Sequence, residues 1–423
     1  MKALGFFDII FLTIETEFGF MKKLWNKDFI LLLQSSTVST LGDLMYSVAI
    51  GYWVFTKTGS SALMGVMSAI SMFVMMFLSP FCGSIVDKLN RKWLMVGLDV
   101  MQGAVMITVG VFAYMNKLSV AGVLVAAFLA ALGSVFYSPA VNTVLLDIIP
   151  RDDMVRGQSV YSASTSLINT VGTAFSGVMV AFFGVPLIVI INGLSNLYAA
   201  ASELLIRVPK TVRQGEAVTL KGVLRDSGVA VKTIFSEPCL KIFVPFALIL
   251  NLLSAGAFAL ILPFCLQKGF SVDMYGYLMT VSTVASLICA IILGTVKLKP
   301  KARFWVMSLG FTLSVLTLTA AYLSKTFLAV CIFAFIGMFL NCAGNSIFNA
   351  SLMLALPEEN RGAMMGFIQS ACVGGSAVST VIYGVLCDIF PIHIVFAVGS
   401  VISLVPMMYL CFHPRVNNFI LSN

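Results

Sequence analysis

The sequence predicts an all-α membrane protein with twelve transmembrane helices arranged in two six-helix halves. The first observation is composition: of 423 residues, 59% are hydrophobic and only 10% are charged, whereas soluble domains carry about 25% charged residues. The second is the length of the apolar stretches, and the third is the uneven placement of Lys and Arg between them. This composition leaves too little polar surface for a soluble enzyme, and the net charge of +8 lies in short loops rather than in a nucleic-acid-binding patch.

The apolar stretches have the length of membrane-spanning helices. A spanning helix needs about 20 mostly apolar residues, and a spanning β-strand only about 10. Twelve stretches meet the helical requirement: 29–55, 61–83, 93–115, 118–148, 158–184, 186–206, 240–266, 274–296, 304–323, 326–356, 363–388 and 391–412. Because these runs lack the alternation of barrel strands, we expect helices throughout.

The basic residues predict the orientation of these helices. Cytoplasmic loops of membrane proteins are enriched in Lys and Arg. If the N-terminus is cytoplasmic, the outer turns hold only four of the 26 basic residues, namely Lys57, Lys117, Lys268 and Lys325. All the others fall in cytoplasmic segments and none in a membrane core. We therefore expect both termini on the cytoplasmic side.

The polar segments divide the chain. We expect a cytoplasmic segment over 1–28, six-helix halves over 29–207 and 240–412, a cytoplasmic linker over 208–239 and a cytoplasmic tail over 413–423. An apolar patch in the first twenty residues is interrupted by Asp8, Glu15 and Glu17, and no small-residue cleavage site follows it, which disfavours a signal peptide. An extension upstream of a second start at Met21 is the favoured interpretation, and a surface-lying amphipathic helix is the alternative.

The two halves echo each other. SPAVNTVLLDIIPRDDMVRG in the first half resembles NSIFNASLMLALPEENRG in the second. In both, an Asn (Asn142, Asn349) lies eight residues before a Pro (Pro150, Pro357), and an acidic pair then leads to Arg-Gly. Parallel repeats of six spans, with a substrate site between them near the midplane, are typical of transporters of the major facilitator type.

The loop after the second predicted span carries a resemblance to that superfamily. Its sequence, GSIVDKLNRK, resembles the major facilitator signature G-x3-D-R/K-x-G-R-R/K, with Asn90 in place of the second Gly. Asn tolerates the left-handed conformation better than most residues, so we expect a mild effect. The resemblance implies that this loop latches the halves together on the cytoplasmic face, with Asp87 meeting the start of the span after Arg361-Gly362. A generic positively charged cytoplasmic loop is the alternative. The loop residues concerned are Gly83, Asp87, Lys88, Arg91 and Lys92.

Further motifs resemble one branch of the superfamily. LGDLMYSVAIGYWVFTKTGSSALMG, GLDVM at Asp99 and SVFYSPAVNTVLLDIIPRDDMVRGQS are similar to the macrolide-efflux and enterobactin-exporter branch of drug:proton antiporters. The stretch from Gly172 to Gly177 resembles the G-P-x-L-G-G element of these antiporters, but Thr173 replaces the Pro and Ser176 replaces a Gly. Import therefore stays open beside export. We expect Asp99 to brace the Arg91 loop and so to act in gating.

Asp43 is the candidate coupling residue. It lies about 15 residues into the first span, or about 20 Å along a helix, with no Lys or Arg in any span core. A charged carboxylate at membrane depth is costly and usually functional. We expect Asp43 to take up and release a proton as the cavity opens to each side, or to neutralise a cationic substrate. The alternatives are a protonated acid bonded to a neighbouring helix and an acid at a watery rim.

Other polar residues inside the spans are candidates for the cavity wall. They are Tyr46, Tyr137, Asn251, Asn341 and Asn345, and for each of them hydrogen bonding between helices is an equal alternative. Asp147 and Glu203 stand at cytoplasmic helix ends, where we expect structural roles. Spans seven to twelve contain no deep acid, so coupling is expected to belong to the first half.

These observations predict a secondary transporter that works by alternating access. The chain has no GxxxxGK[ST] sequence for ATP hydrolysis, no catalytic set at membrane depth, and only two histidines, so we expect no enzyme activity, metal or cofactor. The expected partners are a small-molecule substrate, a proton or Na⁺ gradient and the lipid of a bacterial cell membrane, with no nucleic acid; a monomer is the default of the superfamily. The leading expectation is efflux of an amphipathic or cationic compound such as a macrolide. Export of a siderophore or another endogenous metabolite is the alternative, and a non-transporting sensor or scaffold is disfavoured by the short loops.

Overall fold

The computed structural model describes residues 25–150, 153–208, 240–296, 298–356 and 361–414, together with residues 232, 236 and 237. Helices are the only regular secondary structure in these described residues, as the sequence predicts. Their bounds are α2 (Lys27–Thr58), α3 (Ser61–Lys88), α4 (Arg91–Tyr114), α5 (Val120–Ile148), α6 (Met154–Leu204), α8 (Leu240–Ala259), α9 (Ile261–Gln267), α10 (Val272–Thr295), α11 (Pro300–Leu323), α12 (Phe327–Ala355), α13 (Arg361–Ile389) and α14 (Ile392–Phe412). The expected segment 1–28 lies outside the described residues up to position 24, as do most of the linker 208–239 and the tail from 415 onward.

Ten helices among the described residues are long and apolar enough to cross a membrane. α6 contains two helices that meet at Gly184, whose φ of 72° is the left-handed conformation that favours glycine. Pro186 follows directly and cannot donate a helical hydrogen bond. The break therefore falls where the predicted spans 158–184 and 186–206 are separated.

Several helices begin at a side chain that accepts a hydrogen bond from their first turn. Asn26 accepts from Phe29 N at 2.8 Å, and Asn90 accepts from Trp93 N at 3.4 Å. Asn90 does not adopt the left-handed conformation by which we expected it to replace glycine with a mild effect, because its φ is −73°. Asn90 replaces glycine here as the N-cap of α4, a position that favours Asn.

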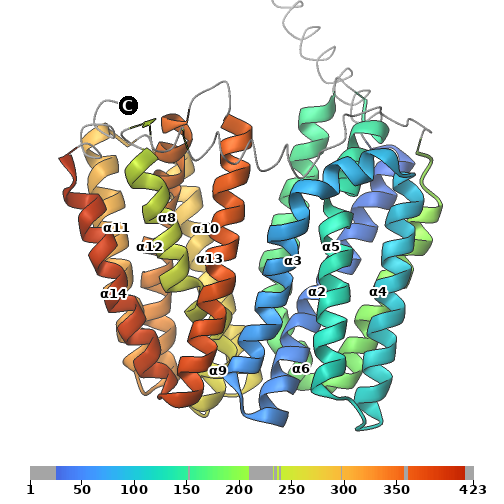
Figure 1. Ribbon diagram of the computed structural model, residues 1–423, viewed down its shortest axis with the longest axis horizontal. Coiled ribbons are helices and arrows are strands. Elements are labelled where there is room, and N and C mark those ends of the chain that lie inside the picture. Colours follow the sequence, from blue (N-terminus) through green and yellow to red (C-terminus); the bar gives the residue numbers. More distant parts are fainter. Residues whose placement is uncertain are drawn as a thin grey trace, which may run out of the picture.

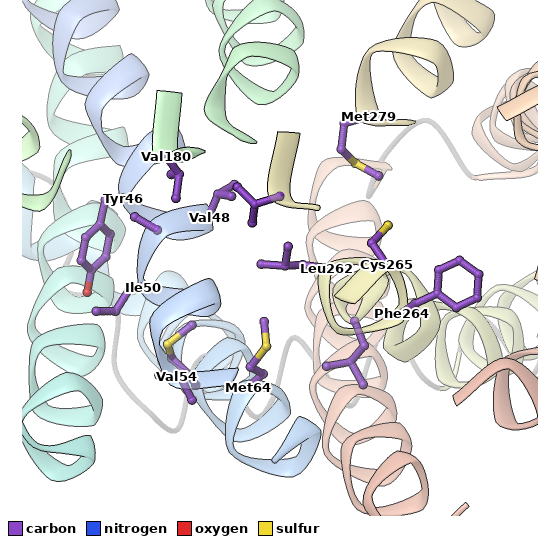
Figure 2. Packing of buried hydrophobic residues seen from close by; sticks show 14 of the residues in the cluster. Tyr46, Val48, Ile50, Val54, Met64, Val180, Leu262, Phe264, Cys265 and Met279 are labelled. Carbon is purple, nitrogen blue, oxygen red and sulfur yellow. The ribbon is translucent and has the colours of Figure 1, made fainter. Parts of the chain in front are cut away.

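The helices form two bundles, α2–α6 and α8–α14, which approach each other around α9 and lie further apart at the opposite end (Figure 1). We call the first the α9 end, and the other, where α4 begins, the Arg91 end. Figure 2 shows Leu262 of α9 pointing toward Val48 and Met64 of the first bundle, with Phe264 on the opposite side of α9. These residues belong to one buried apolar cluster that includes residues of both bundles. At the Arg91 end each bundle has a separate cluster, around Val144 in one and Phe348 in the other.

Glycines permit close contact between the bundles at the α9 end. A Cβ on Gly65 of α3 would lie 2.5 Å from the Thr380 carbonyl oxygen of α13, and a Cβ on Gly177 of α6 would lie 2.8 Å from Gly276 N of α10. Such distances are too short for a side chain. Backbone therefore packs directly against backbone where α3 crosses α13 and where α6 crosses α10.

Candidate functional site

A cavity of about 530 Å³ lies among α2, α3, α4 and α5 of the first bundle, a size typical of small-molecule sites. Most of the surface of its wall is apolar, and Met75, Met106 and Val135 contribute to it. Polar groups from each of the four helices also reach it: Asp43, Tyr46, Ser71, Ser79, Gln102, Ser134, Ser138 and Asn142. Among the described residues that line it, Asp43 is the only charged one.

Asp43 stands between this cavity and α6. Its carboxyl has the side-chain amides of Asn192 and Asn196 as polar partners. Asn192 Nδ2 is buried and has no hydrogen-bond partner of standard geometry. A Cβ on Gly42 would lie 2.6 Å from Asn192 Oδ1. The close approach of α2 and α6 at Gly42 thus brings Asp43 to the two amides.

Polar residues follow one face of α6. Asn192, Asn196 and Glu203 are each no more than 1% exposed. Their positions, with the buried Ala199 between, are separated by four, three and four residues, which places them on one side of a helix. Asn196 Nδ2 donates to Asn192 Oδ1 at 3.0 Å. Neither asparagine is among the residues predicted from the sequence, although polar residues at this spacing inside an apolar span indicate a polar helix face.

Two further acids lie near the Arg91 end of the same bundle. Asp99 of α4 is 2% exposed and Glu203 of α6 is fully buried. Tyr137 of α5 donates its hydroxyl to Glu203 Oε1 at 2.7 Å. Asp99 interacts electrostatically with Glu203 and with Asp43. Asp99 therefore lies near two other acids of the first bundle, a grouping that hydropathy along the sequence does not predict.

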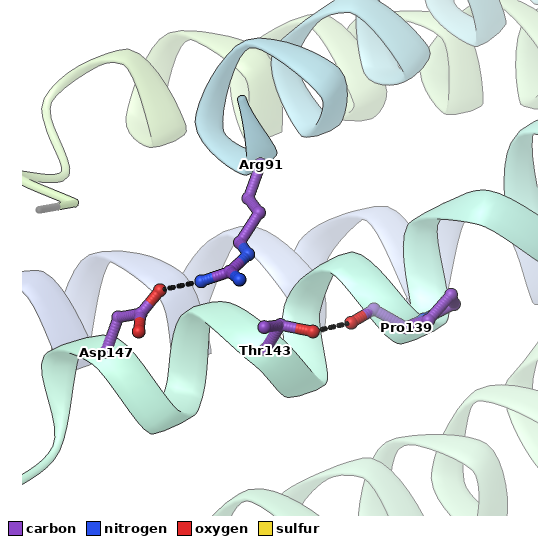
Figure 3. Close-up of polar contacts among 4 residues, drawn as sticks. All are labelled: Arg91, Pro139, Thr143 and Asp147. Carbon is purple, nitrogen blue, oxygen red and sulfur yellow. Dashed lines mark hydrogen bonds and ion pairs between the residues drawn. The ribbon is translucent and has the colours of Figure 1, made fainter. Parts of the chain in front are cut away.

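The predicted gating loop is partly described. Arg91 forms an ion pair with Asp147 of α5 at 2.5 Å (Figure 3), which links the start of α4 to the end of α5. One turn earlier on α5, Thr143 Oγ1 donates to the Pro139 carbonyl at 2.7 Å (Figure 3). Lys92 Nζ donates to the Leu204 carbonyl at the end of α6, at 2.7 Å. Gly83, Asp87 and Lys88 belong to α3, but their side-chain positions are outside what the structure describes, as are those of Arg361 and Gly362.

The antiporter-like element lies where α6 contacts other helices. A Cβ on Gly172 would lie 2.6 Å from Leu44 Cδ1 of α2, one residue after Asp43. Gly177, five residues on, makes the crossing with α10 described above. The two glycines therefore connect the helix of Asp43 with the contact between the bundles.

The remaining candidates divide between cavities and hydrogen bonds. Tyr46 lines the cavity beside Asp43, whereas Tyr137 bonds to Glu203. Asn251 Oδ1 accepts from Ser376 Oγ at 3.2 Å. Asn345 Nδ2 donates to Asn341 Oδ1 at 2.8 Å, and Asn341 lines a separate, mostly apolar cavity of about 280 Å³ in the second bundle.

Comparison with known proteins identifies the family. The model of the family described as transmembrane secretion effector matches residues 20–419, which is nearly the whole chain. The chain belongs to this family of the major facilitator superfamily. This confirms the family resemblance found in the sequence.

Relatives of this secretion-effector family member include efflux proteins. Macrolide efflux protein A of Streptococcus pyogenes is 23% identical over 186 residues, which cover 44% of this chain and 46% of that protein. The match thus spans about half of that relative's length. Multidrug efflux pump Tap of Mycolicibacterium fortuitum is 21% identical over 412 residues, or 93% of this chain and 97% of that protein.

Solved structures confirm the fold. The nucleoside transporter NupG superposes with a TM-score of 0.71 at 12% identity, covering 90% of this chain and 97% of that one. A bacterial homologue of the human lysosomal transporter Spinster, described as inward-facing and unoccupied, gives a TM-score of 0.67 at 13% identity, covering 93% of this chain and 95% of that one. The family and these neighbours are transporters rather than enzymes, and the secretion-effector chain is a multi-pass membrane protein.

Proposed function

We propose that this protein is a secondary active transporter that exports an amphipathic or cationic compound, with a macrolide-like drug as the leading substrate, in exchange for protons. The observation that carries the proposal is Asp43, the one charged residue in the described wall of an otherwise mainly apolar cavity. The cavity suits an amphipathic compound, and its carboxylate suits either a cation or a proton. The names of the efflux relatives support export of drugs.

Alternating access is the proposed mechanism. In the structure, one apolar cluster joins the bundles at the α9 end, while separate clusters occupy the Arg91 end. With the Arg91 end on the cytoplasmic side, this arrangement is an inward-facing state. We propose that the two bundles rock about the contacts at the α9 end, which must part to open the cavity outward.

We also propose a topology of twelve membrane spans. α2 and the part of α6 before Gly184 add two spans to the ten described helices that meet the membrane criterion, which makes twelve in two halves of six. Both termini are then cytoplasmic, the membrane is a bacterial cell membrane, and the transporter works as a monomer.

Proton-driven uptake into inside-out vesicles tests the function. Vesicles carrying the wild type receive an acidic lumen, and uptake of labelled erythromycin is followed with and without a protonophore. We expect the wild type to accumulate the drug, and we expect Asp43→Asn to fall to the protonophore level because its side chain no longer exchanges a proton. Asp273→Asn, which changes an acid in the first turn of α10, is the matched control and should behave as the wild type.

Two outcomes would contradict parts of the proposal. Gradient-driven uptake that survives in Asp43→Asn removes Asp43 from the coupling mechanism. Absence of erythromycin uptake by well-folded wild type removes the macrolide, and siderophores are then the compounds to assay.

A further inference from the structure

Asp99 and Glu203 form an acid pair in the first bundle that the transport mechanism above does not use. They come from α4 and α6 and are 2% and 0% exposed. Glu203 Oε1 accepts from Tyr137, but Asp99 Oδ2 and Glu203 Oε2 are buried without any hydrogen-bond partner. A buried carboxylate oxygen without a donor is costly when charged, whereas a bound proton would supply the missing donor.

The groups around the pair are neutral or acidic. Tyr161 of α6 and Ser36 of α2 lie beside Glu203 and Tyr137, and Asp43 of α2 acts on Asp99. The nearest basic residues along the chain have other contacts: Arg91 pairs with Asp147, and Lys92 bonds to the Leu204 carbonyl. The groups described as acting on the two carboxyls are Asp43 and Glu203 for Asp99 and Tyr137 for Glu203, none of them basic.

The C-terminal end of α6 raises the free-energy cost of a negative charge on Glu203. It is the second-last residue of α6, which ends at Leu204, and the C-terminal end of a helix carries partial negative charge. A second carboxylate nearby is a further repulsion, so two ionised acids in this low-dielectric environment are unfavourable. Pairs of carboxyls in such positions share one proton and titrate as a unit.

We propose that Asp99 and Glu203 together bind one proton, and that this pair is a second proton site between Asp43 and the Arg91 end. Position supports the assignment. Gln102, one turn after Asp99 on α4, lines the cavity that Asp43 faces, so the pair lies one helical turn from that cavity. In the other direction, Glu203 adjoins the end of α6, where Leu204 is 44% exposed. The role of the pair in coupling rests on the proposed function, whereas proton binding by the pair does not.

Infrared spectroscopy of the purified protein in lipid tests the proton site directly. The carbonyl stretch of protonated carboxyl groups is followed as pH is raised. We expect the wild type to show a band that is lost on titration, and we expect Asp99→Asn and Glu203→Gln each to abolish or shift that same band, because the proton is shared. Tyr137→Phe keeps both acids and should shift the titration midpoint by removing the donor to Glu203. Asp273→Asn, in the first turn of α10, is the control and should leave the band unchanged.

Two outcomes of the infrared experiment would overturn the proposal. Either the wild type shows no protonated-carboxyl band assignable to these residues at any pH, or the two substitutions remove two separate bands with unchanged midpoints. Since this measurement needs no substrate, it decides on the pair even if erythromycin is not transported, an outcome that contradicts only the proposed function.

Transport measurements then test the part of the pair in coupling. Exchange of labelled for unlabelled erythromycin across the membrane needs no net proton movement, whereas uptake driven by a pH gradient does. In Glu203→Gln we expect gradient-driven uptake to fall by about a hundredfold, the lower end of the scale for losing a positioned proton-transfer group, with exchange nearly unchanged. Equal loss of both activities would indicate a structural defect and overturn the role in coupling.

Discussion

The two bundles are both helical but differ in the polar side chains that they bury. The first bundle buries Asp99, Glu203, Gln102 and paired asparagines, whereas the buried polar side chains described in α8–α14 are all Ser or Thr. Several of these hydroxyls donate to a carbonyl of their own helix, as Ser282 does to Leu278 at 2.8 Å, and so have little need of partners on other helices. The second bundle is thus held by apolar packing and neutral hydrogen bonds such as that from Gly256 N to Ser379 Oγ, while the first bundle retains ionisable groups that are costly to bury. Retention of such groups is consistent with proton coupling in the first bundle.

The largest expected effect is a loss of stability when Asp147 is removed, compared with the matched position of the second bundle. Asp147 lies three residues before Pro150, and Leu354 lies three residues before Pro357. Asp147 offsets the charge of Arg91, whose side chain is 3% exposed, and removal of one member of a buried ion pair costs about 3–5 kcal/mol. We expect Asp147→Ala to lower the free energy of unfolding by this amount in a detergent denaturation experiment.

Leu354→Ala is the control for that prediction. Leu354 is 59% exposed, so its truncation should change the free energy of unfolding by less than about 1 kcal/mol. Similar losses in the two variants would mean that the ion pair contributes nothing special to the first bundle.

The second effect compares two pairs of asparagines with the same geometry. Asn196 donates to Asn192 on α6 at 3.0 Å, and Asn345 donates to Asn341 on α12 at 2.8 Å. Asn196→Leu and Asn345→Leu each remove one such bond, which should cost about 1 kcal/mol of stability in either bundle. Only the α6 pair adjoins Asp43, so we expect gradient-driven uptake to fall about tenfold in Asn196→Leu, equivalent to about 1.4 kcal/mol.

Uptake by Asn345→Leu at saturating substrate should remain within about twofold of the wild type, a change below about 0.5 kcal/mol. If instead this variant loses as much uptake as Asn196→Leu, coupling is not confined to the first bundle. Thermal unfolding of both variants separates this result from misfolding.

The sequence predicts most of the helices and the position of Asp43, but not the buried cluster around Glu203. Hydropathy locates most of the helices and the break at Gly184, although the predicted span 240–266 divides into α8 and α9. An isolated charge inside an apolar run makes Asp43 a candidate. The burial of Glu203 is not predicted, because Glu203 lies at the end of its span, near Arg207, where an acid is ordinarily solvated. Its burial results from α2, α4 and α5 packing around α6, which hydropathy along one segment does not report. The spacing of Asn192, Asn196 and Glu203 on one helix face is the local signal that anticipates it.

The smallest effect concerns the contact that joins the bundles. Asp388, near the end of α13, accepts from Ser60 Oγ and Ser61 N at 2.6 Å and from Ala62 N at 3.2 Å. Its carboxylate thus caps the N-terminus of α3 in the other bundle, where negative charge is favourable by up to about 1 kcal/mol. Asp388→Asn keeps an acceptor but removes the charge, and should shift the equilibrium about fivefold toward a state open at the α9 end. Spin-label distances across that end measure the shift, with Asp273→Asn, which alters the first turn of its own helix, as the control. An unchanged distance distribution in Asp388→Asn would show that the apolar cluster and the glycine crossings hold the bundles together without this cap.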